Sequence, residues 1–270
     1  MKRVIESLLI FTILFSAFAI AANETPGLEF TDKVDKAYQC LNDQVKAKSS
    51  LALQDALFGA FALGSNSKIE ESINSNKKSG EACWPKSSCT IKETAQSALA
   101  YSRMGKSSKD IETWLNSKTI NVKELVWYIE IDIQNHLNSQ CTIKQGSEES
   151  KITVKDDMTL QDNPGSCLSV SYGGYWLKIN ENCLDKEFTI SCDKDFVTAL
   201  AYQKVNGDRV FISSDTHSSS SLGSTTEKVN SKCLSTGTSC DYEGTLWTAL
   251  VLKKLGQNVK PYLPYLLALS

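Results

Sequence analysis

The strongest constraint on the fold is a cysteine-led pattern that the chain contains twice. One copy starts at Cys89 and the other at Cys240, and each has another cysteine a few residues upstream, Cys83 or Cys233. Counted from Cys89 and Cys240, six positions match: Thr94 and Thr245, Ala98 and Ala249, Leu99 and Leu250, Gly105 and Gly256, the aromatic residues Trp114 and Tyr265, and Leu115 and Leu266. The match predicts that the chain builds the same local structure twice.

Each part of the pattern has a physical meaning. Thr90 and Asp241 follow the two cysteines, and both are residue types that cap a helix N-terminus. The glycine at the +16 position suits the left-handed conformation that ends many helices. A disulfide that closes the short loop before each helix would contribute roughly 2–2.5 kcal/mol in the chain-entropy account. Each copy is therefore predicted to be a helical hairpin behind a disulfide-closed loop.

The remaining chain divides by the period of its apolar residues. Residues 31–138 have a helical period, with three capping-box patterns that predict helix starts: Ser67 with Glu70, Thr90 with Glu93, and Asn121 with Glu124. Residues 139–216 alternate in the manner of strands, and the stretch DFVTALAYQKVNG is also interpreted as a strand. Residues 217–232 are predicted to be a serine-rich linker, and residues 233–270 are helical again. Because an isolated helical hairpin cannot bury its apolar face, we expect one helical domain with a β-domain inserted into it.

The hairpin pattern also resembles a known family. Its T-x-x-x-A-L-x-x-x-x-x-G helix, followed by Trp114 and Leu115, is similar to the repeat of the prenyltransferase and terpenoid-cyclase-like superfamily. The cysteine-led version looks like a family of uncharacterised secreted archaeal proteins with a β insertion. The resemblance implies an α+β protein made of a partial α/α-toroid, with about eight short helices, and an inserted small antiparallel β-domain.

The N-terminus predicts export. Lys2 and Arg3 precede an apolar run that ends in small residues near Ala22, the order of a secretory signal peptide over residues 1–22. The alternative is an uncleaved N-terminal anchor, which would be the chain's only link to a membrane. The net charge of -2 and the pI of about 5.8 argue against nucleic acid as a partner. We therefore expect a secreted or cell-surface protein.

Nine cysteines fit an oxidising compartment. The repeat predicts the disulfides Cys83–Cys89 and Cys233–Cys240. Four further cysteines in the β region would form two disulfides with three possible connectivities: Cys141, Cys167, Cys183 and Cys192. Cys40 is left as a free thiol, predicted to be buried in the first helix, with an inter-chain disulfide as the alternative.

Catalytic signatures that the resemblance implies are missing. The acid motif of the cyclases is reduced to Asp156 and Asp157, and the only histidines, His136 and His217, have no metal-type spacing to a cysteine. No metal or cofactor is therefore predicted. Asp241 and Glu243 beside Trp247 are the candidate acids for an enzyme that acts on a polysaccharide or lipid. Helix capping and packing are the competing explanation of the same residues.

Tyr172, Tyr175 and Trp176 surround Gly173 and Gly174, and together they could form a flat platform for a sugar or a peptide. The alternative is a hairpin whose aromatic rings pack inward. With many fold signals and no catalytic signature, the sequence favours non-enzymatic binding or structural work on an extracellular protein or glycan. The extracellular enzyme is the second hypothesis.

Overall fold

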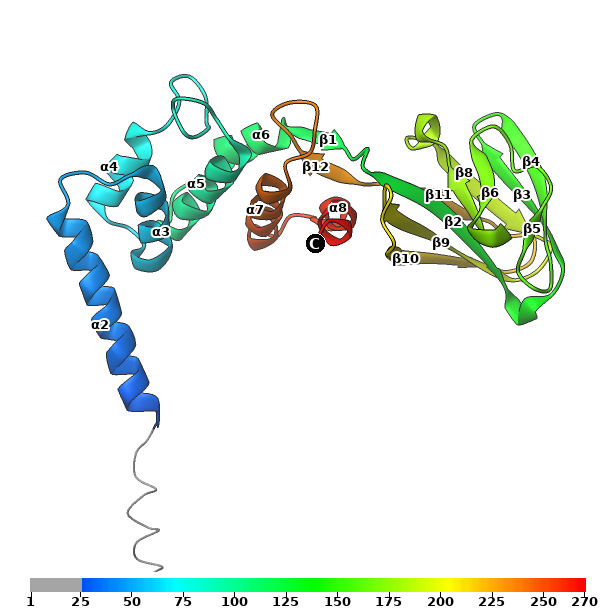
Figure 1. The fold of residues 1–270 in the computed structure, drawn as a ribbon, viewed down its shortest axis with the longest axis horizontal. Helices are drawn as coiled ribbons and strands as arrows, with labels where there is room; N and C mark the ends of the chain where they lie inside the picture. Colours follow the sequence, from blue (N-terminus) through cyan, green and yellow to red (C-terminus); the bar gives the residue numbers. More distant parts are fainter. Residues whose placement is uncertain (1–25) are drawn as a thin grey trace, which may run out of the picture. The chain divides into compact units, whose positions relative to one another are not determined.

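The structure, a computed structural model, describes residues 26–270 (Figure 1). The described chain forms two compact units, one of residues 26–76 with 103–106, and one of residues 77–102 with 107–270. The predicted signal peptide lies outside the described residues. Within the described part, no helix combines the length and the apolar character that a membrane span needs.

The first unit consists of three helices: α2 (Pro26–Ala47), α3 (Leu53–Leu63) and α4 (Ser67–Ser75). α3 ends at Gly64, whose φ of 73° is the conformation that favours glycine. α4 begins after Asn66, whose side chain accepts hydrogen bonds from two backbone N–H groups of the first turn. The capping residue is thus one position before Ser67, where the sequence pattern placed the start.

The second unit contains both copies of the cysteine-led pattern, each as a pair of short helices. The first copy forms α5 (Ile91–Arg103) and α6 (Lys109–Asn116), and the second forms α7 (Tyr242–Lys254), the 3-10 turn η4 (Lys260–Tyr262) and α8 (Leu263–Ala268). Half of the predicted capping box is present at Thr90: its hydroxyl accepts from the backbone N–H of Glu93 at 3.2 Å, but its own backbone N–H donates to the carbonyl of Trp84 instead of to Glu93. Gly105 and Gly256 both have positive φ, 72° and 74°. The two copies therefore use the same helix start and the same glycine turn.

The duplication extends to individual hydrogen bonds. The backbone N–H of Trp84 donates to the hydroxyl of Thr94 at 3.0 Å, and the backbone N–H of Leu234 donates to the hydroxyl of Thr245 at 2.9 Å. Both threonines are completely buried. In each copy, the residue after the first cysteine is therefore hydrogen-bonded to the helix that follows the second cysteine, α5 or α7.

The two hairpins meet at their helix starts. Lys92 on α5 forms a 2.7 Å salt bridge with Glu243 on α7. A Cβ atom on Gly244 would lie only 2.7 Å from side-chain atoms of Ile91, so the two helices approach as closely as glycine allows. Further along, the amide of Gln257 donates to Glu112 on α6 at 2.7 Å.

The predicted α/α-toroid is wrong. The described residues form seven α-helices and twelve strands, and the helices lie mostly in the N-terminal part. Strands begin at Thr119, so the last part of the block predicted as helical contains β-strands. One cause is the Asn121 and Glu124 pair, which resembles a capping box but lies where β1 (Thr119–Asn121) ends and β2 (Leu125–Ile133) begins.

Two short strands mark where the β region leaves and rejoins the helices. β1 pairs antiparallel with β12 (Lys232–Leu234), with Ile120 opposite Cys233. The chain therefore enters and leaves the β region at neighbouring positions.

Between these strands lie two five-stranded antiparallel sheets. The first has the order β10-β9-β2-β7-β6, and its further strands are β6 (Leu168–Ser171), β7 (Trp176–Ile179), β9 (Phe196–Lys204) and β10 (Val210–Ser219). The second has the order β11-β8-β3-β4-β5, with strands β3 (Ser139–Gln145), β4 (Glu148–Val154), β5 (Leu160–Gln161), β8 (Glu187–Cys192) and β11 (Thr225–Lys228). Residues 217–232, predicted as a linker, contain the end of β10 and all of β11. The four-residue stretch TTEK of β11 is too short to predict a strand from the sequence. In the structure its residues alternate, and Thr225 and Glu227 lie in the interior.

The two sheets pack face to face as a β-sandwich. Ile129, Ile131 and Ile133 of β2 are buried at every second position, as are Phe188 and Ile190 of β8. Polar groups also bridge the two sheets. Thr198 of β9 is bonded to Thr225 and Glu227 of β11, and all three side chains are buried.

Four disulfides join the described cysteines: Cys83–Cys89, Cys141–Cys192, Cys167–Cys183 and Cys233–Cys240. Cys141 and Cys192 lie directly opposite each other on β3 and β8. Four disulfides are typical of proteins that fold in an oxidising compartment. Cys40 is a free thiol but is exposed, not buried as predicted, because α2 leaves most of its surface open.

Candidate functional site

The outward face of the first sheet carries a small hollow lined by aromatic and acidic side chains, which we call the aromatic hollow. Its volume is about 260 Å³. Its lining residues come from β2, the start of β7 with the turn before it, and the loop before β5: Glu130, Ile131, Asp132, Met158, Tyr172, Tyr175 and Trp176. The three aromatic residues that the sequence singled out therefore lie around one cavity.

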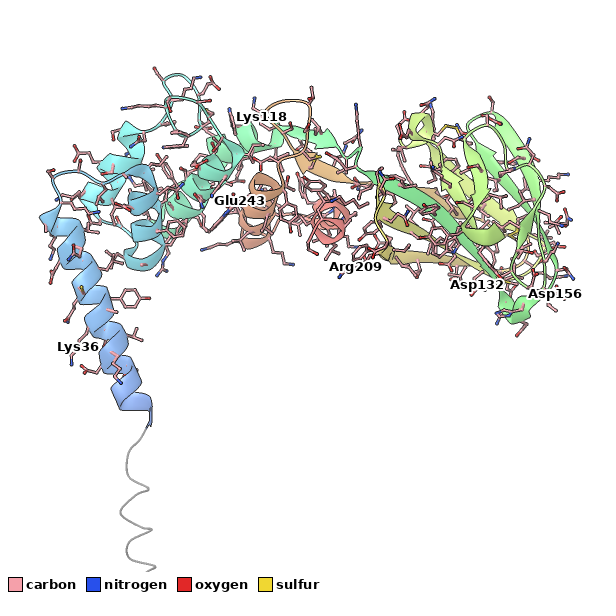
Figure 2. The ribbon with its side chains drawn as sticks, in the orientation of Figure 1. Lys36, Lys118, Asp132, Asp156, Arg209 and Glu243 are labelled. Carbon is pink, nitrogen blue, oxygen red and sulfur yellow. A yellow bond between two sulfur atoms is a disulfide. The ribbon has the colours of Figure 1, made fainter. Side chains whose placement is uncertain are left out.

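Strand register brings these residues together. Glu130 of β2 is paired with Trp176 of β7, and side chains two positions apart on a strand share a face. Asp132 consequently lies beyond Glu130 on the same outward face, near the end of β2 (Figure 2). Tyr172 has a φ of 53°, and Gly173 and Gly174 have φ of 69° and 105°. This tight turn between β6 and β7 places the tyrosines beside the strand pair.

The rings contact one another rather than packing into the core. Tyr172 lies 4.4 Å from Trp176 and 5.2 Å from Tyr128, measured between ring centroids. The hydroxyl of Tyr172 donates to the side-chain carbonyl of Gln203 at 2.6 Å. Tyr172 is 42% exposed and Tyr175 is 48% exposed. Burial of Tyr128 beneath them, together with the neighbouring Tyr172, raises the pKa of Tyr128.

The two carboxylates at the hollow are free of cationic partners. Neither Glu130 nor Asp132 takes part in a salt bridge with any side chain of residues 31–270. Their oxygens are therefore open to accept hydrogen bonds from a bound molecule. Sequence reasoning missed both residues as members of this site, because the pairing of β2 with β7 joins segments that are distant in the chain.

The predicted acids Asp241 and Glu243 have structural roles at the start of α7. Asp241 caps the helix by accepting the backbone N–H of Gly244 at 2.9 Å. Glu243, labelled in Figure 2, binds Lys92, and this hydrogen bond is the main cause of the raised pKa of Lys92. Trp247 lies half-buried further along α7. The structure does not bring these three residues to the aromatic hollow.

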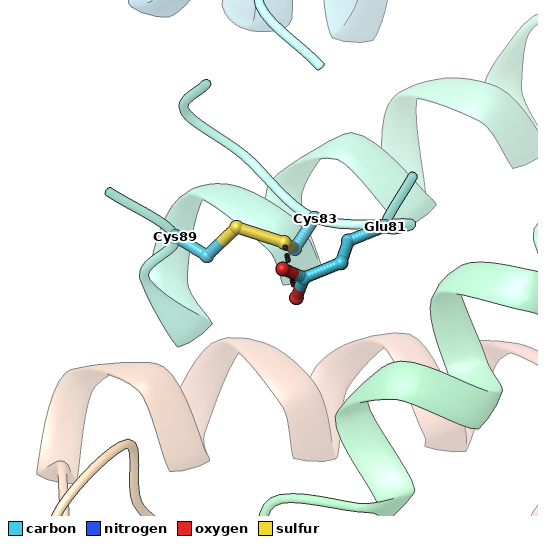
Figure 3. A group of neighbouring side chains, drawn as sticks. All are labelled: Glu81, Cys83 and Cys89. Carbon is cyan, nitrogen blue, oxygen red and sulfur yellow. Dashed lines mark hydrogen bonds between the residues drawn. A yellow bond between two sulfur atoms is a disulfide. The ribbon is translucent and has the colours of Figure 1, made fainter. Parts of the chain in front are cut away.

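One group in the described chain has the spacing of a metal site: Glu81, Cys83 and Cys89 (Figure 3). The two sulfur atoms are joined in a disulfide, so neither is a thiolate that could bind a metal. Glu81 instead accepts a hydrogen bond from the indole of Trp114 at 3.3 Å. The group is therefore explained as part of the disulfide loop.

A second and larger cavity, of about 440 Å³, lies within the second unit between the sandwich and the C-terminal helix. Its lining includes His217, Glu227, Trp127 and Lys260. None of these was a predicted site residue. His217 and Glu227 lie on different sheets, so neither their spacing nor their local period indicated that they meet.

Comparison with known proteins gives no relative for the chain: no family model, no curated protein and no solved structure matches it. Together with the β-sandwich, this result overturns the resemblance to the prenyltransferase and terpenoid-cyclase-like superfamily and to its secreted archaeal branch. The function must be inferred from the geometry of the chain itself.

Proposed function

We propose that the protein is a secreted or cell-surface glycan-binding protein, and that the aromatic hollow is its sugar site. The observation that carries this proposal is the gathering of exposed Tyr172, Tyr175 and half-buried Trp176 around a cavity that also holds two unpaired carboxylates. The four disulfides support the extracellular location.

The chemistry of the hollow fits a sugar ring. A pyranose has one apolar C–H face that packs on an aromatic ring, and hydroxyl groups around its edge that donate to carboxylates. Covering about 50 Å² of apolar surface on one ring contributes on the order of 1 kcal/mol. Glu130 and Asp132 supply acceptor oxygens at the rim of the hollow.

The negative charge of the hollow limits which sugars can bind there. A uronic acid would bring a third carboxylate to a hollow whose lining contains two acidic side chains and no basic one. The ligand is therefore a neutral or amino sugar, since like charges at this distance repel.

The test is a glycan array followed by calorimetric titration with the glycan that binds best. Tyr175→Ala should lower the affinity about 5- to 10-fold, because one stacking ring is lost. Tyr38→Ala is the matched control: Tyr38 is 47% exposed and lies on α2 in the other unit, so its loss should leave the affinity unchanged. Binding that resists Tyr175→Ala and Trp176→Ala, or an array with no signal above background, would refute the proposal.

A further inference from the structure

The second cavity, which we call the histidine cleft, is built around a buried acid. Glu227 is 2% exposed, and its Oε1 accepts from the hydroxyl of Thr198 at 2.6 Å. His217 Nδ1 lies 2.8 Å from the same oxygen. With Glu227 Oε1 as the acceptor, Nδ1 of His217 is the donor of this hydrogen bond. The ring of His217 is thus held in one orientation while half of it remains exposed.

Two polar groups at this cleft have no hydrogen-bond partner among the described residues. Glu227 Oε2 forms no hydrogen bond with any described residue. The indole N–H of Trp127, which is buried and also lines the cleft, lacks an acceptor. Leaving the buried indole N–H of Trp127 unpaired costs about 1–3 kcal/mol. One carboxylate oxygen is therefore free to accept a hydrogen bond, and one buried indole nitrogen needs an acceptor, at the same cavity.

The opposite wall is apolar and open. Ile212, Leu263 and Leu267 line the cleft and are 57%, 39% and 46% exposed. β10 is irregular between Ile212 and Thr216, and the extra residues of this bulge face the cleft rather than a strand partner. An apolar wall opposite a small set of polar groups is the usual lining of a small-molecule site.

The charges at the cleft disfavour an ionic head group. Lys260 is neutralised by Asp215 at 2.8 Å, and Lys228 also lines the cavity. A ligand with an ammonium group would be repelled by Lys228, and a ligand with an anionic group would be repelled by the carboxylate of the buried Glu227. A hydroxyl group is neutral, donates to a carboxylate oxygen and accepts from an indole N–H, so it satisfies both unpaired groups.

We propose that the histidine cleft binds an alcohol with an apolar body, whose hydroxyl lies between Glu227 and Trp127 and whose hydrocarbon lies against α8 and β10. This site is separate from the aromatic hollow and does not depend on glycan binding. Three observations carry it: a carboxylate oxygen of the buried Glu227 with no hydrogen bond, a buried indole N–H without an acceptor, and an exposed apolar wall, all in one cavity.

The probes are 1-octanol, octanoate and octylamine, which share a hydrocarbon chain and differ in the head group. Saturation-transfer nuclear magnetic resonance on the full chain measures their binding, followed by titration for the affinity. We expect saturable binding of 1-octanol and at least 10-fold weaker binding of the two ionic probes. Equal or tighter binding of octanoate or octylamine, or no saturable binding of 1-octanol, overturns the proposal.

Two substitutions localise the site without depending on the buried acid. Trp127→Phe keeps an aromatic ring but removes the donor, and should weaken 1-octanol about 2- to 10-fold, the loss of one neutral hydrogen bond. Leu267→Lys puts a charge on the apolar wall and should weaken 1-octanol at least 10-fold. Leu222→Lys is the matched control, since Leu222 is 81% exposed and does not line the cleft. Circular dichroism verifies that each variant is folded, and a Leu267→Lys protein that is folded and binds like wild type overturns the assignment.

Discussion

Replacing the duplicated threonines tests whether the two cysteine-led copies are stabilised by the same interaction. Thr94→Val and Thr245→Val keep the branched shape of the side chain but remove its oxygen. Each change leaves a buried backbone N–H, of Trp84 or Leu234, without the acceptor that now lies 3.0 or 2.9 Å away. An unsatisfied buried donor costs about 1–3 kcal/mol, and both threonines are fully buried, so this range applies to both.

The loss should be somewhat larger at Thr94. Its hydroxyl also donates to the backbone carbonyl of Trp84 at 3.2 Å. The free energy of unfolding is measured by urea denaturation with the disulfides intact, with far-ultraviolet circular dichroism as the signal. Thr216→Val is the control, because Thr216 is exposed on β10. If either buried variant loses less than about 0.5 kcal/mol, as surface substitutions do, the shared hydrogen bond does not stabilise the repeat.

Three further predictions concern single features of the fold. Burial is the main cause that raises the pKa of Tyr265 from its usual 10.0 to about 12. The contribution of neutral Tyr265 to the free energy of unfolding is therefore complete below pH 10.0 and is lost as pH rises toward 12. In an ultraviolet titration, the Tyr265→Phe variant should lack the last tyrosine to ionise. Removing the disulfide between Cys141 and Cys192, which are 51 residues apart, should lower the free energy of unfolding by about 4 kcal/mol, measured by denaturation of the double alanine variant. Gly244→Ala should destabilise by about 1–3 kcal/mol because its Cβ would overlap α5, whereas Gly237→Ala has open space and should be neutral; equal melting temperatures for the two variants would contradict the close helix contact.

Local features of the repeat were predictable from the sequence, but their neighbours were not. The Thr90 capping interaction and the glycine turns depend on residues close in the chain, and they appear as expected. The toroid required that further hairpins surround these two. The repeat itself contains no information on that point, and the chain instead turns to strands at Thr119. The strand predicted in DFVTALAYQKVNG is β9, although residues 198–202 are all buried and the segment lacks the alternation of a strand with one exposed face.

The aromatic hollow and the histidine cleft also combine features that were predictable from nearby residues with contacts that were not. Tyr172, Tyr175 and Trp176 are close in sequence, so their gathering could be predicted, although the direction of their rings could not. Glu130 and Asp132 join them only through the register of β2 with β7. His217 and Glu227 meet across two sheets, and such contacts depend on sandwich packing that no local period encodes.

The pairing of β1 with β12 makes the β-sandwich a removable module. Since Asn121 and Lys232 are direct strand partners, a short turn could join them and bypass the whole sandwich, at the cost of the contacts that α8 makes with β9 and β10. The reverse also holds: both ends of the sandwich lie together, so it could be transplanted into a loop of another protein. The aromatic hollow belongs to the sandwich alone and would move with it, whereas the histidine cleft also needs α8, which packs against β9 and β10.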